Sequence, residues 1–140
     1  MINSRSLDDL HPHVKKLAES FIETCSAEEI EILIYSTYRD NIAQNALYAR
    51  GRSRAGKIVT NAKGGESYHN YRLAFDFVPR IGNQLLWGDK TLYKECGAIA
   101  VSVGLEWGGN WVNFKDMPHC QYSEGLSLKD LQAGKQIKGV

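Results

Sequence analysis

The segment Leu73–Val78, with the sequence LAFDFV, places a carboxylate inside the most apolar strand candidate of the chain. Apolar and aromatic residues that alternate with a period of two predict a β-strand. On such a strand Asp76 shares a face with Ala74 and Val78, because successive side chains point to opposite faces. A buried carboxylate is costly unless it is paired or bound to a metal ion. The fold must therefore supply Asp76 with a partner.

The chain before this strand predicts both helix and sheet. Apolar residues recur at helical spacing over 10–22, which indicates an amphipathic helix with Pro12 in its first turn or just before it. The run 30–38, IEILIYSTY, is rich in β-branched and aromatic residues and predicts a buried strand. Asp40 can cap a second helix, for which Gly51 is a suitable end.

The chain around and after LAFDFV continues this mixture. Residues 51–65 form a long loop without periodicity, of the kind that is usually functional or disordered. A turn at Gly82 leads to a hairpin partner at 84–87, and residues 91–103 predict a helix. The remainder alternates aromatic residues with glycines and ends in a short strand and a polar tail. Since no regular βαβ alternation occurs, we predict an α+β domain, with helices packed against a small antiparallel sheet.

Length and charge exclude several functional classes. The chain has 140 residues and a net charge of +1, which fits one ordinary domain and lacks the basic footprint of a nucleic-acid binder. No run approaches the ~18 to 20 apolar residues of a membrane span, and the first residues lack a secretory signal. The three cysteines are widely spaced and odd in number, which predicts buried thiols rather than a disulfide framework.

Two short clusters carry the candidate chemistry, His69 with Asp76 and Asp116 with His119. Two imidazoles and one carboxylate are a ligand set that catalytic zinc uses, with a fourth position open for water. If His69, Asp76 and His119 bind zinc, Asp116 remains as a general base. The residues alone leave another interpretation open, in which His69 is a loop histidine, Asp76 caps a turn, and the other two form a surface pair.

The segment 67–77, SYHNYRLAFDF, resembles the Ser-x-His-x-x-x-x-Ala-x-Asp signature of the M15 zinc peptidases, which include D-Ala-D-Ala carboxypeptidases and L-alanyl-D-glutamate endopeptidases. The segment 116–121, DMPHCQ, resembles their second signature, in which an acidic base precedes the last histidine ligand by three residues. The stretches 36–52, 58–70 and 105–119 are also similar to the family. The resemblance covers about residues 32–122 in the right order.

The resemblance implies a role for each candidate residue. The implied zinc ligands are His69, Asp76 and His119. Asp116 is the implied general base, and Arg39 is a cation near the substrate carboxylate or the developing oxyanion. Taken alone, Arg39 is equally well explained by a surface ion pair with Asp40. Gln44 and Ser67 are candidates for orienting substrate or ligand, although a helix cap or a solvated residue explains them as well.

Two positions depart from the family pattern. Arg72 stands where glycine is common, and Asn110 stands where the family often has aspartate. Arg72 either points outward, narrows the cleft or adds a contact to an anionic substrate, so both departures concern subsite preference rather than metal binding. The loop also carries a group of basic residues, namely Arg50, Arg52, Arg54, Lys57 and Lys63. They are either solvated charges or a means of attracting the carboxylates of stem peptides.

The resemblance implies a Hedgehog/DD-peptidase-like fold and a zinc-dependent peptidoglycan hydrolase, most similar to the L-alanyl-D-glutamate endopeptidases of phage endolysins. The alternatives are a D-Ala-D-Ala carboxypeptidase or dipeptidase, and a non-catalytic zinc-containing wall-binding module. We expect a monomer whose partners are stem peptides, with no nucleic acid and no membrane insertion. We expect one catalytic domain over 1–140 without a separate wall-binding domain. It would be made in the host cytoplasm without a signal peptide and reach the wall after holin-mediated release or lysis.

Overall fold

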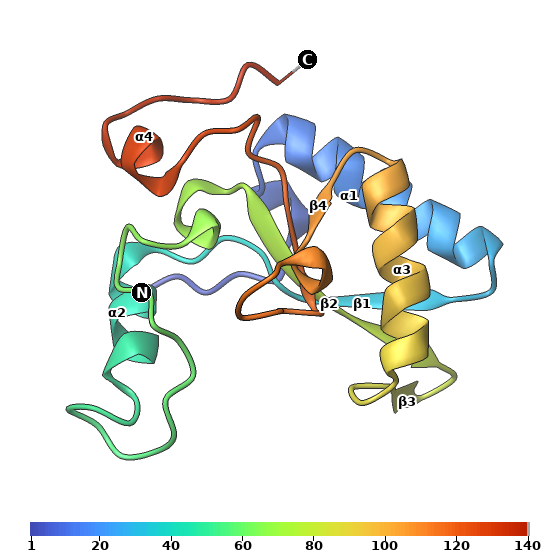
Figure 1. Ribbon diagram of the computed structural model, residues 1–140, viewed down its shortest axis with the longest axis horizontal. Helices are drawn as coiled ribbons and strands as arrows, with labels where there is room; N and C mark the ends of the chain where they lie inside the picture. The colour runs from blue at the N-terminus through green and yellow to red at the C-terminus, as the bar shows by residue number, and fades with distance from the viewer. Residues whose placement is uncertain (140) are drawn as a thin grey trace.

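The computed structural model describes residues 1–139 and confirms the α+β class. Figure 1 shows α1 and α3 toward one end of the molecule and α2 and α4 toward the other. The α-helices are α1 (Pro12–Ala27), α2 (Asn41–Ala49), α3 (Lys90–Ser102) and α4 (Leu128–Gln132). The strands are β1 (Glu31–Ser36), β2 (Ala74–Ile81), β3 (Gln84–Leu85), β4 (Glu106–Trp107) and β5 (His119–Gln121). Three short 3-10 helices are η1 (Leu7–Asp9), η2 (Tyr68–Tyr71) and η3 (Gly108–Asn110).

The strands form one antiparallel sheet in the order β1-β2-β5-β4, and β3 pairs with the far end of β2. The predicted apolar strand is therefore β2, which has neighbours on both sides. Its register places Asp76 opposite Ser36 on β1 and opposite His119 on β5. Strand pairing thus brings the carboxylate next to a histidine that lies 43 residues later in the chain.

One face of the sheet packs against α1 and α3. Phe75 and Phe77 alternate with Asp76 along β2 and are fully buried on this face. The ring of Phe77 lies 5.0 Å from that of Phe21 on α1 and 5.3 Å from that of Tyr93 on α3. The core therefore occupies one side of β2, and Asp76 points to the other side.

The three cysteines are free thiols buried in this core, as expected. Cys120 pairs with Trp107 across β4 and β5 and is fully buried. Because Cys120 directly follows His119 on a strand, its side chain points away from the metal-ligand candidates. Cys120 therefore belongs to the core and not to the His69–Asp76–His119 cluster.

Several predicted elements form, with corrected boundaries. Pro12 is the first residue of α1, and Asp40 caps α2 by accepting from the backbone N–H of Ala43 at 2.8 Å. Helix α1 continues to Ala27, well beyond the predicted end, because its buried face extends to Cys25. The strand predicted as buried, β1, is mostly half-buried.

The carboxyl-terminal part differs most from the expectation. The segment expected to be a polar tail contains α4, whose first turn has a reciprocal cap between Ser127 and Asp130. This helix buries Leu131 against the core. None of the helices within residues 1–139 is long and apolar enough to cross a membrane.

Candidate active site

The structure brings together the three predicted metal ligands, of which His119 lies 43 residues after Asp76 in the sequence. The Nε2 of His69 lies 3.3 Å from Asp76 Oδ2, and the Nδ1 of His119 lies 3.5 Å from Asp76 Oδ1. One ligand atom from each residue lies within 4.8 Å of the others. Ligand atoms at 2.0–2.1 Å around a tetrahedral ion stand about 3.4 Å apart, so the cluster has dimensions suited to zinc.

Each histidine is held with a lone pair toward Asp76. The Nδ1 of His69 lies 2.7 Å from the backbone carbonyl oxygen of Thr37, which only accepts, so Nδ1–H is the donor. The Nε2 of His119 donates in the same way to Gln121 Oε1 at 2.7 Å. The remaining nitrogen of each ring is therefore unprotonated in the neutral form and faces the carboxylate. Two nitrogens and one oxygen, presented in this way, fit a zinc ion with an open coordination position.

The pKa of Asp76 favours its role as an anionic ligand. Burial raises the pKa of this carboxyl group, but the neighbouring imidazoles of His69 and His119 lower it by a larger amount. The net result is a pKa well below the ordinary value, so the carboxylate is ionised. The cost of burying the charge is offset by the same groups that complete the ligand set.

The Ser-x-His spacing has a local structural cause. Ser67 is the N-cap of η2, and its hydroxyl accepts from the backbone N–H of His69 at 3.3 Å. The side chain of Asn70 returns to the N–H of Ser67 at 3.1 Å and donates to the carbonyl of Arg39 at 2.8 Å. Ser67 thus caps the turn that carries a ligand, as one of its two sequence interpretations proposed, and it also lines the cleft.

Asp116 lies beside the cluster and remains open to the cleft. Its Oδ2 is 4.0 Å from His119 Nδ1, and the side chain is 49% exposed. Partial burial is the largest influence on this carboxyl group and raises its pKa. The carbonyl of Asp116 accepts from the backbone N–H of His119 at 3.1 Å, which explains the three-residue spacing as a turn.

A glycine makes room for this turn. The N–H of Asp116 donates to the carbonyl of Gly108 at 3.0 Å, and a Cβ added at Gly108 would lie 2.3 Å from the carbonyl oxygen of Asp116. Only glycine permits so close a backbone approach. Gly108 therefore helps to place Asp116 at the edge of the site.

Arg39 follows β1 and points into the same site. Its Nη1 donates to Gln44 Oε1 at 2.9 Å and its Nη2 donates to Ser36 Oγ at 3.1 Å, while Nη2 is 3.7 Å from Asp76 Oδ2. Within residues 1–139, Arg39 Nε is the buried side-chain nitrogen without a hydrogen-bond partner. A buried donor without a partner costs about 1–3 kcal/mol, which makes it a candidate for binding an oxygen of a ligand.

Gln44 is fully buried beneath the guanidinium group of Arg39. Its Nε2 donates to the carbonyl of Ala62 at 2.8 Å, and its Oε1 accepts from Arg39. Both ends of the amide are occupied, and Gln44 lies outside the lining of the cleft. The residue therefore holds Arg39 and ties the long loop to α2.

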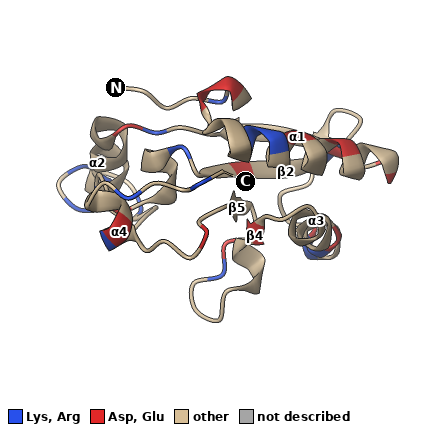
Figure 2. Ribbon diagram, turned by 90° about the horizontal axis from the view of Figure 1, so that it is seen from above, with Lys and Arg blue, Asp and Glu red and all other residues tan. Residues whose placement is uncertain are grey.

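The cluster residues, Asp116, Arg39 and Ser67 line a cleft of about 620 Å³. One side consists of α2 and the loop after it, including Arg50 and Val59, and the other includes Trp111, whose ring lies 5.1 Å from that of His119. Figure 2 shows Lys and Arg residues gathered around α2 and its neighbouring loop. The cleft lining therefore combines the cations Arg39 and Arg50 with the His69–Asp76–His119 cluster.

Comparison with known proteins identifies the family. A family model described as D-alanyl-D-alanine carboxypeptidase matches residues 60–122. The chain is 39% identical over 122 residues to the peptidoglycan L-alanyl-D-glutamate endopeptidase CwlK of Bacillus subtilis, covering 81% of this chain and 73% of that protein. The chain belongs to the M15 peptidase family.

Further comparisons agree with this membership. The chain is 35% identical over 127 residues to the L-alanyl-D-glutamate peptidase of Listeria phage A118, covering 86% of this chain and 41% of that protein. The crystal structure of the Serratia marcescens L-Ala D-Glu endopeptidase ChiX has the same fold, with a TM-score of 0.65 and 20% identity. That match covers 87% of this chain and 89% of the solved one.

The departures from the M15 pattern lie outside the cleft. Arg72 has a φ of +64°, a left-handed conformation that favours glycine and explains why the family often has glycine there. Its guanidinium carbon lies 3.8 Å from the ring centroid of Tyr38, and Nη1 donates to the carbonyl of Asp9 at 2.7 Å. Asn110 is exposed and also lies outside the cleft lining.

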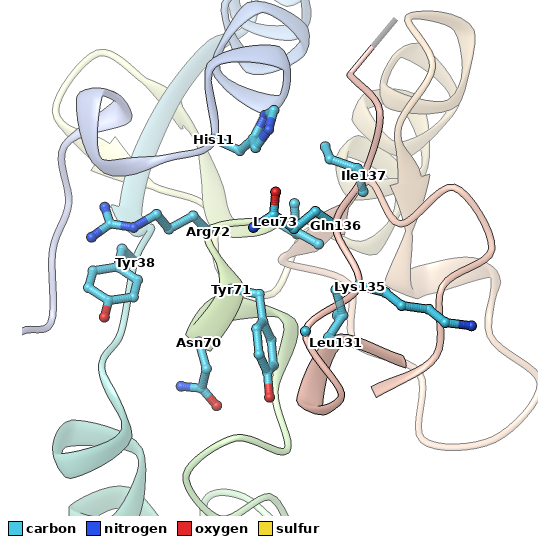
Figure 3. Close-up of a pocket in the computed structure, with 11 residues that line it drawn as sticks. His11, Tyr38, Asn70, Tyr71, Arg72, Leu73, Leu131, Lys135, Gln136 and Ile137 are labelled. Carbon is cyan, nitrogen blue, oxygen red and sulfur yellow. The ribbon is translucent and has the colours of Figure 1, made fainter. Parts of the chain in front are cut away.

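Figure 3 shows Arg72 extended toward Tyr38 at a second cavity, of about 330 Å³, whose other walls include Leu131 and Ile137. Arg72 therefore does not narrow the catalytic cleft of this M15 peptidase.

The basic loop residues have separate roles. Arg50 lines the cleft, whereas Arg52 stacks on Tyr48 at 3.8 Å and donates to the carbonyls of Tyr48 and Thr60. Lys63 Nζ lies 5.4 Å from the ring centroid of Tyr48 on α2, and Arg54 and Lys57 are exposed on the loop after α2. Arg52 thus stabilises the loop, and Arg50 is the one of the five that contributes charge to the cleft lining.

Sequence reasoning missed the residues that orient the ligands. Gln121 lies two positions after His119 on a strand, and this spacing could have indicated a side chain on the same face. Thr37 contributes its backbone carbonyl, and Glu106 reaches Gln121 through the pairing of β4 with β5. The sequence carries no local signal for the last two contacts.

Proposed function

We propose that this M15 peptidase is a zinc-dependent peptidoglycan hydrolase that cleaves stem peptides between L-alanine and D-glutamate. The observation that carries the proposal is the cluster of His69, Asp76 and His119, in which both imidazoles present a lone pair beside the carboxylate, with Asp116 at its edge. The names of the Bacillus and phage relatives, at 39% and 35% identity, support the bond specificity.

His69, Asp76 and His119 would hold the metal. Bound zinc supplies a Lewis acid that polarises the scissile carbonyl and lowers the pKa of a water molecule. The hydrogen bonds from the two rings to Thr37 and Gln121 keep the ligand nitrogens directed at Asp76, so the protein need not reorganise to bind the ion.

Asp116 acts as the general base in this proposal. It takes a proton from the attacking water and returns it to the leaving amine as the peptide bond breaks. Its raised pKa makes it a better base than an ordinary exposed aspartate, and its partial exposure keeps it accessible to substrate. A non-catalytic wall-binding module has no need of such a base beside the ligands.

Arg39 binds the anionic part of the substrate or the oxyanion that develops on the carbonyl oxygen. Two of its nitrogens are fixed by Gln44 and Ser36, and the buried Nε remains available as a donor. A guanidinium group that is fixed before substrate arrives stabilises developing charge without reorganisation. Gln44 serves as a positioning residue for Arg39, and Ser67 serves the same purpose for His69.

The alternative activity is that of a D-Ala-D-Ala carboxypeptidase, which the description of the matching family model favours. Both activities use the same metal cluster and base, so they differ in how the cleft binds the peptide on either side of the scissile bond. The cation of Arg50 in the cleft lining suits a substrate that extends through the cleft and carries a carboxylate there.

The test is digestion of purified muropeptides by the zinc-loaded protein, with the products identified by mass spectrometry. We expect cleavage between L-alanine and D-glutamate, and loss of that cleavage after chelation. Release of terminal D-alanine alone would establish the carboxypeptidase activity instead. Wall binding without any cleavage would establish the module.

We also propose that the protein acts as a monomeric catalytic domain and reaches the wall after holin-mediated release or lysis. The similarity to a phage peptidase supports this route. Light scattering on the purified protein tests the monomer, and a mass of two chains would contradict it.

A further inference from the structure

A row of three polar side chains supports His119 from the side of its ring opposite the ligand nitrogen. Gln121 Oε1 accepts from His119 Nε2 at 2.7 Å, and Gln121 Nε2 donates to Glu106 Oε1 at 3.1 Å. The backbone N–H and the hydroxyl of Ser123 both donate to Glu106 Oε2, at 2.8 and 2.9 Å. His119, Gln121 and Ser123 are each at most 6% exposed, so water does not replace these contacts readily.

The row has a direction because the carboxylate of Glu106, between Gln121 and Ser123, accepts hydrogen bonds and does not donate them. The carboxylate of Glu106 receives the N–H of Ser123 and can meet only the NH₂ group of Gln121. That contact turns the carbonyl oxygen of Gln121 toward His119. The imidazole must then carry its proton on Nε2, which leaves Nδ1 with a lone pair facing Asp76.

We propose that Glu106, acting through Gln121, is a positioning residue that fixes the tautomer of His119 in which Nδ1 can bind the metal. The proposal rests on the proposed function insofar as His119 is a metal ligand. It goes beyond that function by assigning the orientation of one ligand to a carboxylate that does not reach the metal cluster.

The two histidine ligands differ in how firmly their tautomers are set. His69 donates to the backbone carbonyl of Thr37, a group that no side-chain substitution can reverse. His119 depends on the side-chain amide of Gln121, which can rotate by 180° and present either its oxygen or its NH₂ group. The carboxylate of Glu106 favours the orientation in which the Gln121 NH₂ group points to Glu106 and the Gln121 oxygen points to His119.

The informative variant is Glu106→Gln, which keeps the size of the side chain and replaces an acceptor with a group that can also donate. The introduced amide can still accept from the N–H of Ser123 while it donates to Gln121. Gln121 can then turn its NH₂ toward His119, which moves the imidazole proton to Nδ1. A protonated Nδ1 cannot bind a metal, so the variant should populate a state that does not bind zinc.

Two measurements on the full chain test this. Long-range ¹H–¹⁵N spectra of the metal-free protein, at a pH that leaves the imidazoles neutral, report which nitrogen of each ring carries the proton. Competition with a chelator reports the dissociation constant for zinc. We expect Nε2–H at His119 in the parent chain, a mixture in Glu106→Gln, and zinc binding weakened by about tenfold or more. His69 should keep Nδ1–H throughout and serves as an internal control.

The matched rescue is the double variant Glu106→Gln, Gln121→Glu, which exchanges the two groups. His119 again meets an acceptor, and the amide at position 106 donates to the new carboxylate, so the Nε2–H tautomer and the zinc affinity should return to within about threefold of the parent. Ser123→Ala is the control, because it removes a contact to Glu106 and leaves the contact between Glu106 and Gln121 in place.

The proposal is overturned if Glu106→Gln keeps Nε2–H at His119 and binds zinc as tightly as the parent. It is also overturned if the exchanged pair fails to restore the tautomer, because the effect would then come from general disruption. These outcomes are independent of turnover. A chain that shows the expected tautomers and cleaves no muropeptide would contradict the proposed function and leave this inference intact.

Discussion

The contact between Gln44 and Arg39 offers a sharp test of how the cleft is built. Replacing Gln44 with leucine retains most of the side-chain volume and removes both hydrogen bonds of the buried amide, to Arg39 Nη1 and to the carbonyl of Ala62. Each buried partner left without a hydrogen bond costs about 1–3 kcal/mol. Since Arg39 is near the cleft and can recruit water, the lower end applies, and we expect a loss of about 2 kcal/mol in the free energy of unfolding.

This loss corresponds to a measurable change in melting temperature. An unfolding entropy of about 2.1 cal/mol/K per residue makes 1 kcal/mol worth about 3 °C for a chain of this length, so Tm should fall by about 7 °C. The protein stays folded at 25 °C, because domains typically have about 5–15 kcal/mol of stability. Calorimetry on the parent and Gln44→Leu proteins measures the shift.

The effect on catalysis should be larger than a simple loss of stability explains. Arg39 would keep one of its two anchors, Ser36, and a misplacement of about 1 Å can cost about 100-fold in rate. We expect kcat/KM for muropeptide cleavage to fall by about that factor, while the zinc dissociation constant stays within twofold. The two hydrogen bonds of Gln44 go to Arg39 and Ala62 rather than to a candidate metal ligand, which is why affinity for zinc should not change.

A double-mutant cycle decides whether the effect passes through Arg39. In an Arg39→Ala background, Gln44→Leu should have little further effect on kcat/KM, because the group that Gln44 positions is already absent. Additive losses in the two variants would refute this reasoning. A Gln44→Leu protein with parent-like kcat/KM and a lowered Tm would equally show that Gln44 has only a structural role.

Three further predictions concern the metal site and its support. Asp116→Asn should lower kcat by about 100-fold or more, while the bound zinc content stays within twofold of the parent. Activity assays and metal analysis measure the two quantities, and loss of the metal would make Asp116 a ligand instead. Zinc at 100 times its dissociation constant should stabilise the folded protein by about 2.7 kcal/mol. The Tm of the zinc-loaded protein should therefore fall when chelator is added, and an unchanged Tm would argue against the metal site. Gly97→Ala should destabilise by about 1–3 kcal/mol in denaturant titration, because the added Cβ would lie 2.2 Å from Trp107, and a neutral effect would mean that the ring moves freely.

The local part of the site was predictable from the sequence. The alternation in LAFDFV located β2 and put Asp76 on the face opposite Phe75 and Phe77, and strand geometry alone makes that assignment. Asp40 and Pro12 marked helix starts because capping and proline geometry depend on neighbouring residues. The resemblance to the M15 signatures selected the ligand set from among several histidine and aspartate combinations.

Other features were beyond the sequence because they depend on which segments pair in space. The register of β2 with β5 joins Asp76 to His119, and no local pattern specifies it. The burial of Gln44 beneath Arg39 and the outward path of Arg72 follow from packing between distant segments.

The sequence by itself thus determined which residues are candidates to carry the chemistry and which face of β2 bears the carboxylate, because periodicity, caps and motif spacing act over a few residues. The tertiary structure alone decided which nitrogen of each histidine meets Asp76. Thr37 and Gln121 set those tautomers through hydrogen bonds, and Glu106 reaches Gln121 across paired strands. Hydrogen-bond direction depends on groups that meet only after folding, so the fold completes a site whose candidate ligands the sequence already names.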